Sequence, residues 1–347
     1  MLAVQHTQIG QRLTIRDIDV PAPAPGEVLI KVEAASICHT DLGILDYTPD
    51  DLRKRRIELP LTLGHETAGV VCELGAGVTS TAVGDRVVVF GAWGCGSCAQ
   101  CARGEENLCL RRPERGWAMP GLGRAGGMAE YLLVDDARHL VQIPEDLDFA
   151  VAAPLADAGV TPYHAVDLSR HKLTAGATAV VIGAGGLGHV AIQILKAVTP
   201  ATVVAVDTDP AKLELAERSG ADFRLLSHPG TADEIRRLTG GDKADVVLDF
   251  VGAPATTELG LAVVRGGGDI TVVGAGGGRV PVGISDIPEL TARTVYWGGR
   301  SDLIAVVDLA RRGLIEPAVQ TYPLKDALTA FDDVHHGRVL GRAVLVP

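Results

Sequence analysis

The chain has 347 residues, which is enough for about two domains with a sizeable buried core. Its 32 lysines and arginines stand against 43 aspartates and glutamates, a formal net charge of −11, and its longest basic run is only four residues, Arg53–Arg56. This balance argues against a nucleic-acid or anionic-membrane surface and favours a small-molecule partner. Hydrophobic residues make up 47% of the chain, as in a globular protein.

The N-terminal residues predict a cytoplasmic protein, because residues 1–20 lack a basic head, an apolar core and a cleavage site. In a reducing compartment, the six cysteines are expected to be metal ligands or free thiols. The longest apolar stretch, Ala175–Val190, contains five glycines and predicts a strand, a turn and a helix rather than a membrane span.

Residues 1–155 are expected to form a β-rich domain. Short β-strand patterns, separated by glycines and prolines, predict strands at Glu27–Glu33, Thr67–Glu73, Arg86–Phe90, Ala129–Val134 and Leu140–Ile143. No helical pattern longer than a few turns is evident there.

Residues 156–298 show a different pattern, in which apolar strands alternate with helices. The expected strands are Ala179–Gly183, Thr202–Asp207, Phe223–Leu226, Val246–Val251, Ile270–Gly274 and a last one at Val295–Trp297. The expected helices are Gly186–Val198, Pro210–Ser219, Ala232–Leu238 and Pro254–Val264. This alternation predicts an α/β domain with a doubly wound parallel sheet. Residues 299–347 follow, with a helix at Ser301–Arg312 and a final strand at Arg342–Val346, and are expected to return to the first domain.

A glycine motif marks the start of the second domain. Gly183, Gly185 and Gly188 have the G-x-G-x-x-G spacing between an apolar strand and a helix, as pyrophosphate binding requires. Asp207 ends the next strand, where a carboxylate accepts a hydrogen bond from the ribose of NAD and repels the 2′-phosphate of NADP. We therefore expect NAD; the alternative is a glycine-rich turn beside a surface aspartate.

Four cysteines lie in one short lobe, 95–109, and are expected to bind a structural zinc ion. Closely spaced thiolates suit tetrahedral zinc, and four of them leave no coordination position open for chemistry. An iron–sulfur cluster and free thiols are the alternatives. The four residues are Cys95, Cys98, Cys101 and Cys109.

Two further segments indicate a second metal. Cys38-His39-Thr40-Asp41 follows one strand-like run, and Gly64-His65-Glu66 follows another. The stretch GHETAGVVCELGAGV, Gly64 to Val78, matches the GHExxGxxxxxGxxV signature of the zinc-containing medium-chain alcohol dehydrogenases. With the cysteine lobe and the glycine motif, the chain resembles that family over nearly its whole length, and most resembles its bacterial NAD-dependent secondary-alcohol dehydrogenases.

The resemblance implies a GroES-like catalytic domain, a Rossmann NAD-binding domain and two Zn²⁺ per chain. It implies that Cys38 and His65 are ligands of the catalytic zinc and that Asp41 orients His65. Glu66 would lie beside the metal as an alternative ligand. Many relatives supply a third ligand from a cysteine; this chain has Asp157 instead, which a helix N-cap would also explain. Cys72 matches no motif and is expected in the core.

The resemblance also implies the chemistry. Zinc acts as a Lewis acid on the alcohol, a hydride passes to NAD, and Thr40 hydrogen-bonds the reacting hydroxyl. Gly43 stands where many relatives carry a histidine of the proton relay, so ribose, water or His39 remain as routes; His39 is otherwise expected at the cofactor pyrophosphate or in solvent.

Further cofactor and substrate contacts are implied less specifically. The cofactor residues are Thr161, Gly186, Leu187, Lys212, Phe250, Gly274 and Arg342; Trp297 and Tyr296 would line the substrate cleft or a subunit contact. We expect a homo-oligomer, a tetramer or else a dimer. The alternatives are a polyol or sugar dehydrogenase, an aldehyde reductase, and, from another class, a non-catalytic zinc- and dinucleotide-binding sensor.

Overall fold

A computed structural model describes residues 1–283 and 286–347. The chain divides into two compact units. The first comprises Met1–Asp157, Gly299–Arg311 and Pro317–Pro347, and the second comprises Ala158–Gly298 and Arg312–Glu316. The C-terminal segment therefore rejoins the first unit, except for residues 312–316.

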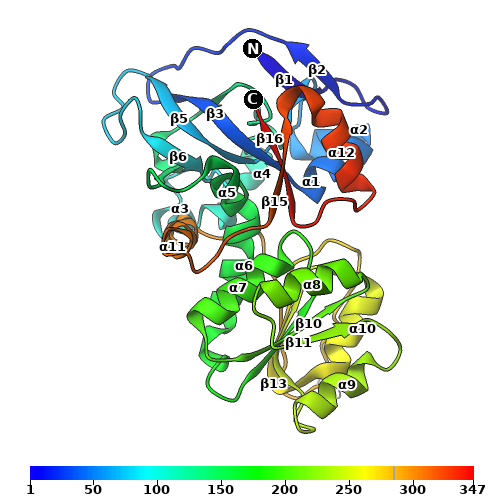
Figure 1. The fold of residues 1–347 in the computed structure, drawn as a ribbon. Helices are drawn as coiled ribbons and strands as arrows, with labels where there is room; N and C mark the ends of the chain where they lie inside the picture. The colour runs from blue at the N-terminus through cyan, green and yellow to red at the C-terminus, as the bar shows by residue number, and fades with distance from the viewer. Residues whose placement is uncertain (284–285) are drawn as a thin grey trace. The chain divides into compact units, whose positions relative to one another are not determined.

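The first unit is built on two sheets (Figure 1). The smaller has the order β2-β1-β4, from Thr14–Asp17, Leu2–His6 and Leu61–Thr62. The larger has the order β15-β16-β3-β5-β6-β8, with β7 also paired to β3. Its strands are β15 Val319–Pro323, β16 Arg342–Val346, β3 Val28–Ile37, β5 Glu66–Leu74, β6 Arg86–Val89, β8 Leu140–Gln142 and β7 Tyr131–Val134.

The first unit's helices within residues 1–155 are short, as expected, whereas α11 has 12 residues. The helices of this unit are α1 His39–Gly43, α2 Pro49–Arg55, α3 Ala99–Ala102, α4 Arg112–Arg115, α5 Phe149–Pro154, α11 Arg300–Arg311 and α12 Ala327–His335. Single turns are η1 Ile44–Asp46, η2 Glu106–Leu108, η3 Ala137–His139 and η6 Leu324–Asp326. After α5 the chain continues as a π-helical turn, η4 Leu155–Gly159.

The antiparallel pairing of β3 with β5 brings distant residues together. Ser36 near the end of β3 pairs with Glu66 at the start of β5. The residues that follow β3 and those that precede β5 therefore lie at the same end of this sheet. This register places the Cys38 segment beside the His65 segment.

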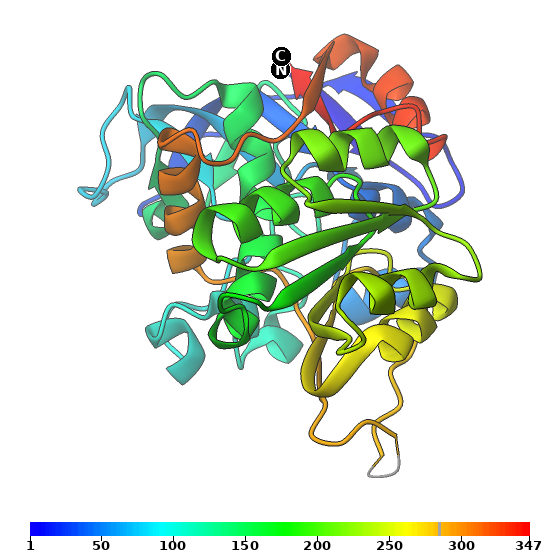
Figure 2. The same cartoon turned by 60° about the horizontal axis from the view of Figure 1, so that its bottom comes forward.

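The second unit has a six-stranded parallel sheet with the order β11-β10-β9-β12-β13-β14. Its strands are β9 Thr178–Ile182, β10 Thr202–Asp207, β11 Phe223–Leu226, β12 Ala244–Asp249, β13 Val264–Val272 and β14 Thr291–Thr294. Its helices are α6 Val160–Ser169, with the turn η5 Arg170–Lys172, α7 Gly188–Val198, α8 Pro210–Arg218, α9 Thr231–Leu238 and α10 Pro254–Val263. Figure 2 shows the green and yellow strands and helices of this unit from a second direction.

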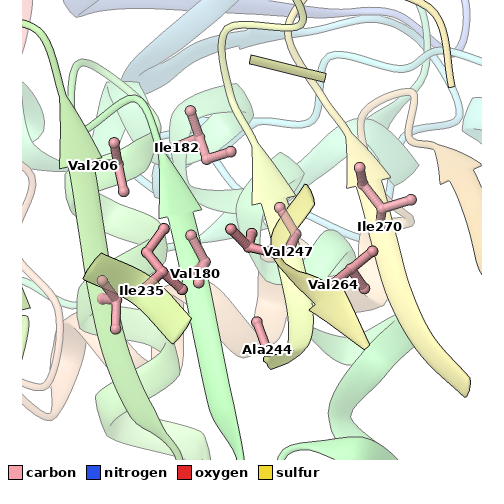
Figure 3. Close-up of a cluster of buried hydrophobic side chains, with 10 residues drawn as sticks. Val180, Ile182, Val206, Ile235, Ala244, Val247, Val264 and Ile270 are labelled. Atoms are coloured by element: carbon pink, nitrogen blue, oxygen red, sulfur yellow. The ribbon is translucent and has the colours of Figure 1, made fainter. Parts of the chain in front are cut away.

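Alternation along the central strands fills both faces of this sheet. Val180 and Ile182 of β9 belong to a buried cluster that includes Ile235 of α9 (Figure 3). The intervening Val181 faces the other side, where the start of α7 packs closely against it at Gly188. Burying each valine or isoleucine fully stabilises the fold by about 1.5–3 kcal/mol. Because both faces of this sheet are buried, consecutive residues of the central strands are apolar.

Two expectations about local structure are wrong. The last strand of this sheet is β14, Thr291–Thr294, and not Val295–Trp297; Trp297 has φ +54°, a left-handed conformation that a strand does not accommodate. Cys72 on β5 is only half-buried; it lies at the irregularity in the β3–β5 register, between the paired residues Val71 and Glu73.

Candidate functional site

Four side chains of the first unit converge in the pattern of a metal site. Cys38 caps the start of α1, His65 precedes β5, Glu66 begins β5, and Asp157 lies in the π-helical turn η4. One ligand atom from each of the four lies within 4.8 Å of all the others. Asp157 is therefore within a π-turn rather than at a helix N-cap.

The spacing of these atoms fits tetrahedral zinc. Asp157 Oδ2 lies 3.5 Å from Cys38 Sγ and 3.7 Å from His65 Nε2. Zinc bonds of ~2.0–2.3 Å at a tetrahedral angle give ligand–ligand edges of roughly 3.3–3.8 Å. The donor set of one thiol, one imidazole and carboxylates is also one that zinc prefers.

Asp41 positions two members of this cluster through hydrogen bonds. The Nδ1–H of His65 donates to Asp41 Oδ1 at 3.2 Å, and the backbone N–H of Cys38 donates to Asp41 Oδ2 at 2.9 Å. Both side chains are buried. Because Asp41 holds a proton on Nδ1, the neutral form of His65, the form that binds a metal, has its lone pair on Nε2, the nitrogen that faces Asp157.

Glu66, a member of the cluster, also forms a buried ion pair with Arg342. Arg342 of β16 donates through Nη2 to Glu66 Oε1 and through Nε to Ser36 Oγ, and only 3% of Arg342 is exposed. Glu66 Oε2 is buried without a hydrogen-bond partner among the described residues. A buried carboxylate oxygen without a hydrogen-bond partner, next to the ligand atoms of Cys38, His65 and Asp157, agrees with the expectation that Glu66 is an alternative metal ligand.

Burial and charge act against each other on the ionisable groups here. Burial disfavours the imidazolium, but Asp41, Asp157 and Cys38 hold the pKa of His65 well above its usual range. Burial raises the pKa of Glu66 to about 7, although the Arg342 guanidinium opposes the rise. A cation placed among these groups would relieve the accumulated negative charge.

Thr40, Gly43 and His39 are residues of α1. Thr40 Oγ1 lies 3.7 Å from Cys38 Sγ, so its hydroxyl is next to the donor set. A Cβ at Gly43 would meet nothing within 4 Å, so this position leaves open space where many relatives carry a histidine. His39 is exposed.

The four-cysteine lobe also has the geometry of a metal site. All four thiols are free, and their sulfur atoms gather within 4.8 Å of one another. The Sγ of Cys101 lies 3.4 Å from that of Cys98 and 3.9 Å from that of Cys95. Four thiolates at ~2.3 Å from one zinc would lie about 3.8 Å apart.

Backbone donors prepare the lobe for negative charge. The N–H of Cys98 donates to Cys95 Sγ at 3.3 Å, and the N–H of Cys95 donates to Cys109 Sγ at 3.4 Å. The N–H groups of Ser97 and Cys98 lower the pKa of Cys95 to about 5. Burial raises the pKa of Cys101 to about 12. A bound cation would stabilise both thiolates.

A polar network that the sequence analysis missed anchors this lobe. Glu106 accepts hydrogen bonds from the Gly94 N–H at 2.7 Å, from His139 Nε2 at 3.1 Å and from Arg138 Nε at 3.3 Å. His139 is fully buried and stacks on Trp93, with ring centroids 5.0 Å apart. Burial disfavours the Glu106 carboxylate, but His139, Gly94 and Arg138 together hold its pKa at about 2. Glu106 lies inside the cysteine motif and could have been noticed there; His139 has no sequence signal.

In the second unit, the glycine motif forms the turn between β9 and α7. Gly183 has φ +87°, and a Cβ on Gly188 would lie 1.8 Å from the Gly183 carbonyl oxygen, so both positions require glycine. A Cβ on Gly185 would meet nothing, since that side of the loop is open. Within the part of the chain that the structure describes, nothing accepts the N–H groups of Gly185, Gly186 and Leu187.

These partly exposed N–H groups at a helix start fit a pyrophosphate. Asp207 holds the loop from the neighbouring strand: its Oδ2 accepts the Ala184 N–H at 2.8 Å and its Oδ1 accepts the Asp209 N–H at 3.0 Å. Asp207 is only 9% exposed, so it is not a surface aspartate. Each carboxylate oxygen retains a lone pair for a ribose hydroxyl.

The remaining expected cofactor residues occupy different places. Phe250 and Gly274 follow β12 and β13, whose carboxyl ends lie on the same side of the sheet as the glycine loop. Thr161 is buried near the start of α6, and Lys212 is half-buried on α8. The rings of Tyr296 and Trp297 meet edge to face at 5.8 Å.

Comparisons with known proteins agree with this geometry. Residues 24–145 match the alcohol dehydrogenase GroES-like domain, and residues 186–312 match the zinc-binding dehydrogenase domain. An NAD-dependent alcohol dehydrogenase of Sulfurisphaera tokodaii is 37% identical over 100% of both chains. The chain belongs to the zinc-containing medium-chain alcohol dehydrogenase family. It is therefore a zinc-dependent oxidoreductase that transfers a hydride between an alcohol and NAD.

Other members of the family extend the comparison. The crystal structure of an alcohol dehydrogenase from Aeropyrum pernix has a TM-score of 0.91 at 34% identity, covering 100% of both chains. An acetophenone reductase of Geotrichum candidum, solved with NAD, has a TM-score of 0.86 at 32% identity, covering 100% of this chain and 97% of that one. A D-arabinose 1-dehydrogenase (NADP(+)) of Saccharolobus solfataricus is 35% identical over 98% of this chain and 96% of that protein. No described helix is long and apolar enough to span a membrane.

Proposed function

We propose that this dehydrogenase oxidises secondary alcohols with NAD at a zinc ion held by Cys38, His65 and Asp157. The observation that carries the ligand assignment is the pair of distances from Asp157 Oδ2, 3.5 Å to Cys38 Sγ and 3.7 Å to His65 Nε2. These distances match the edges of a zinc tetrahedron, and three protein ligands would leave its fourth position for the alcohol.

The charge of this ligand set suits the reaction. One thiolate and one aspartate neutralise Zn²⁺, whereas Glu66 and Arg342 neutralise each other. When bound, zinc supplies a Lewis acid that lowers the pKa of the alcohol, and NAD accepts the hydride. Asp41 keeps the lone pair of neutral His65 on Nε2. The Thr40 hydroxyl oxygen accepts a hydrogen bond from the substrate hydroxyl.

We assign the cofactor to the glycine loop. The N–H groups of Gly185, Gly186 and Leu187 bind the pyrophosphate, and Asp207 accepts from the adenosine ribose. The segment directly after Asp207, Thr208-Asp209, offers no cation for a 2′-phosphate. This supports NAD over NADP.

The secondary-alcohol preference is supported by the acetophenone reductase among the structural relatives, whose named substrate is a ketone. The second candidate is a sugar dehydrogenase, which the D-arabinose dehydrogenase relative favours. The homo-oligomer, with a tetramer preferred to a dimer, and the cytoplasmic location remain predictions from the sequence; mass photometry of the purified chain tests the first.

One assay separates these functions. The purified enzyme is given primary alcohols, secondary alcohols and aldoses with NAD⁺ or NADP⁺, and its zinc is counted by mass spectrometry. We expect two zinc ions per chain and the highest kcat/KM with a secondary alcohol and NAD⁺. A higher kcat/KM with an aldose would favour the sugar dehydrogenase, and no oxidation by a preparation with two zincs would refute the proposal.

The ligand assignment has its own test. Asp157→Ala is expected to remove about one zinc per chain and the activity, while circular dichroism stays unchanged. Asp148→Ala, which removes an exposed helix-capping carboxylate from the same helical stretch, is the matched control and should retain both zincs. Full activity in Asp157→Ala would show that another residue completes the site.

A further inference from the structure

A buried histidine beside the glycine loop takes part in none of the steps above. His189 is the second residue of α7 and has no exposed surface. Its Nδ1 lies 2.7 Å from the carbonyl oxygen of Gly185, and its backbone N–H donates to the same oxygen at 3.2 Å. Because a carbonyl oxygen only accepts, the proton of this imidazole is on Nδ1.

This bond fixes the orientation of one peptide plane of the loop. The carbonyl of Gly185 and the N–H of Gly186 belong to the same trans peptide, so they point in opposite directions. Drawing the Gly185 oxygen toward His189 directs the Gly186 N–H away from the helix. That N–H is one of those with no acceptor among the described residues.

Glycine by itself does not hold this orientation. Gly185 and Gly186 lack side chains that restrict the peptide, and a Cβ on Gly185 would meet nothing within 4 Å. The other side of the loop is held at Ala184, whose N–H donates to Asp207. His189 therefore supplies the second of two side-chain attachments that flank the partly exposed N–H groups.

We propose that His189 is a positioning residue that presets the loop for the cofactor pyrophosphate. In this role it acts through the Gly185–Gly186 peptide. The inference rests on the proposed assignment of NAD to this loop and extends it to a residue outside the glycine motif. A preset loop binds the pyrophosphate without first losing conformational freedom.

The test compares probes that contain or lack the pyrophosphate. Affinities of the intact enzyme for NADH, ADP-ribose and adenosine are measured by fluorescence, the last two by displacement of NADH. His189→Phe keeps the size of the ring and removes the donor. We expect it to bind NADH and ADP-ribose about 5- to 10-fold more weakly, the effect of one hydrogen bond, and adenosine within about twofold of wild type.

Two further substitutions keep the test decisive if the Phe variant does not fold. His189→Asn retains an N–H donor near the Nδ1 position and should bind ADP-ribose within about threefold of wild type. His189→Gln moves the donor outward and should bind ADP-ribose as weakly as the Phe variant. Equal affinities of the Asn and Gln variants would overturn the inference.

The control lies one turn further along the same helix. Gln193→Leu removes two hydrogen bonds to the backbone of Glu316, at 3.0 and 2.6 Å, without touching the loop, and should leave ADP-ribose affinity unchanged. An equal loss of adenosine and ADP-ribose affinity in His189→Phe would refute the positioning role. If wild type binds neither NADH nor ADP-ribose, the proposed function fails; if wild type binds both and His189→Phe binds them equally well, only this inference fails.

Discussion

Asp41 offers the sharpest test of how the catalytic site is held. Its two oxygens accept from two different donors, the His65 Nδ1–H at 3.2 Å and the Cys38 backbone N–H at 2.9 Å. Asp41→Asn keeps the shape of the side chain but has one acceptor oxygen and one NH₂ donor. One of the two donors therefore loses its acceptor and faces another N–H group.

The magnitude follows from this loss. A hydrogen bond to a charged group contributes about 1.5–3 kcal/mol, and Asp41 is fully buried, so water does not replace it. At about 1.4 kcal/mol per factor of ten, the catalytic zinc should bind about 10- to 100-fold more weakly. The four-cysteine zinc should be unaffected, because Asp41 makes no contact with that lobe in the interactions described.

The assay is a titration with a zinc chelator, followed by zinc counting and by kcat/KM. Asp51→Asn is the matched control, since Asp51 has the same third-residue position in α2 and accepts from the Thr48 N–H at 3.1 Å, but is half-exposed and belongs to neither candidate metal cluster. We expect the control to retain both zincs. The reasoning is refuted if Asp41→Asn holds its catalytic zinc as tightly as wild type.

Three other predictions concern separate parts of the molecule. Cys101→Ser should lose one zinc and lower Tm while the other zinc remains, as metal counting and calorimetry will show; two retained zincs would contradict the lobe's role. Glu106→Gln should lower the free energy of unfolding in urea by about 1–3 kcal/mol at pH 7. Because the folded pKa of Glu106, about 2, is below the unfolded value near 4.5, its stabilisation is present above pH 4.5 and lost as the pH falls toward 2, so the two proteins should converge in acid. Asp207→Ala should raise the KM for NAD⁺ and lower the ratio of kcat/KM with NAD⁺ to kcat/KM with NADP⁺. An unchanged ratio would exclude Asp207 from the ribose site.

The sequence by itself determined which chemical groups are available. Regular spacing carries that information: Cys95 to Cys109, Gly183 to Gly188, and the alternating strands and helices after residue 156 all depend on neighbours in the chain. These local patterns predicted the α/β fold, the two metals and the dinucleotide loop, and the comparisons confirm the family, the fold and both cofactors.

Only the tertiary structure decided which distant groups meet. Asp157 lies 119 residues from Cys38, yet their ligand atoms are 3.5 Å apart, because the first unit folds the segment that follows β3 against the residues that follow α5. The pairing of Arg342 with Glu66 spans 276 residues and depends on β16 joining the sheet beside β3. Local sequence patterns do not predict such contacts, because packing and strand register determine them. The same reason explains why His139 and His189, ordinary residues in the sequence, emerged only from the fold.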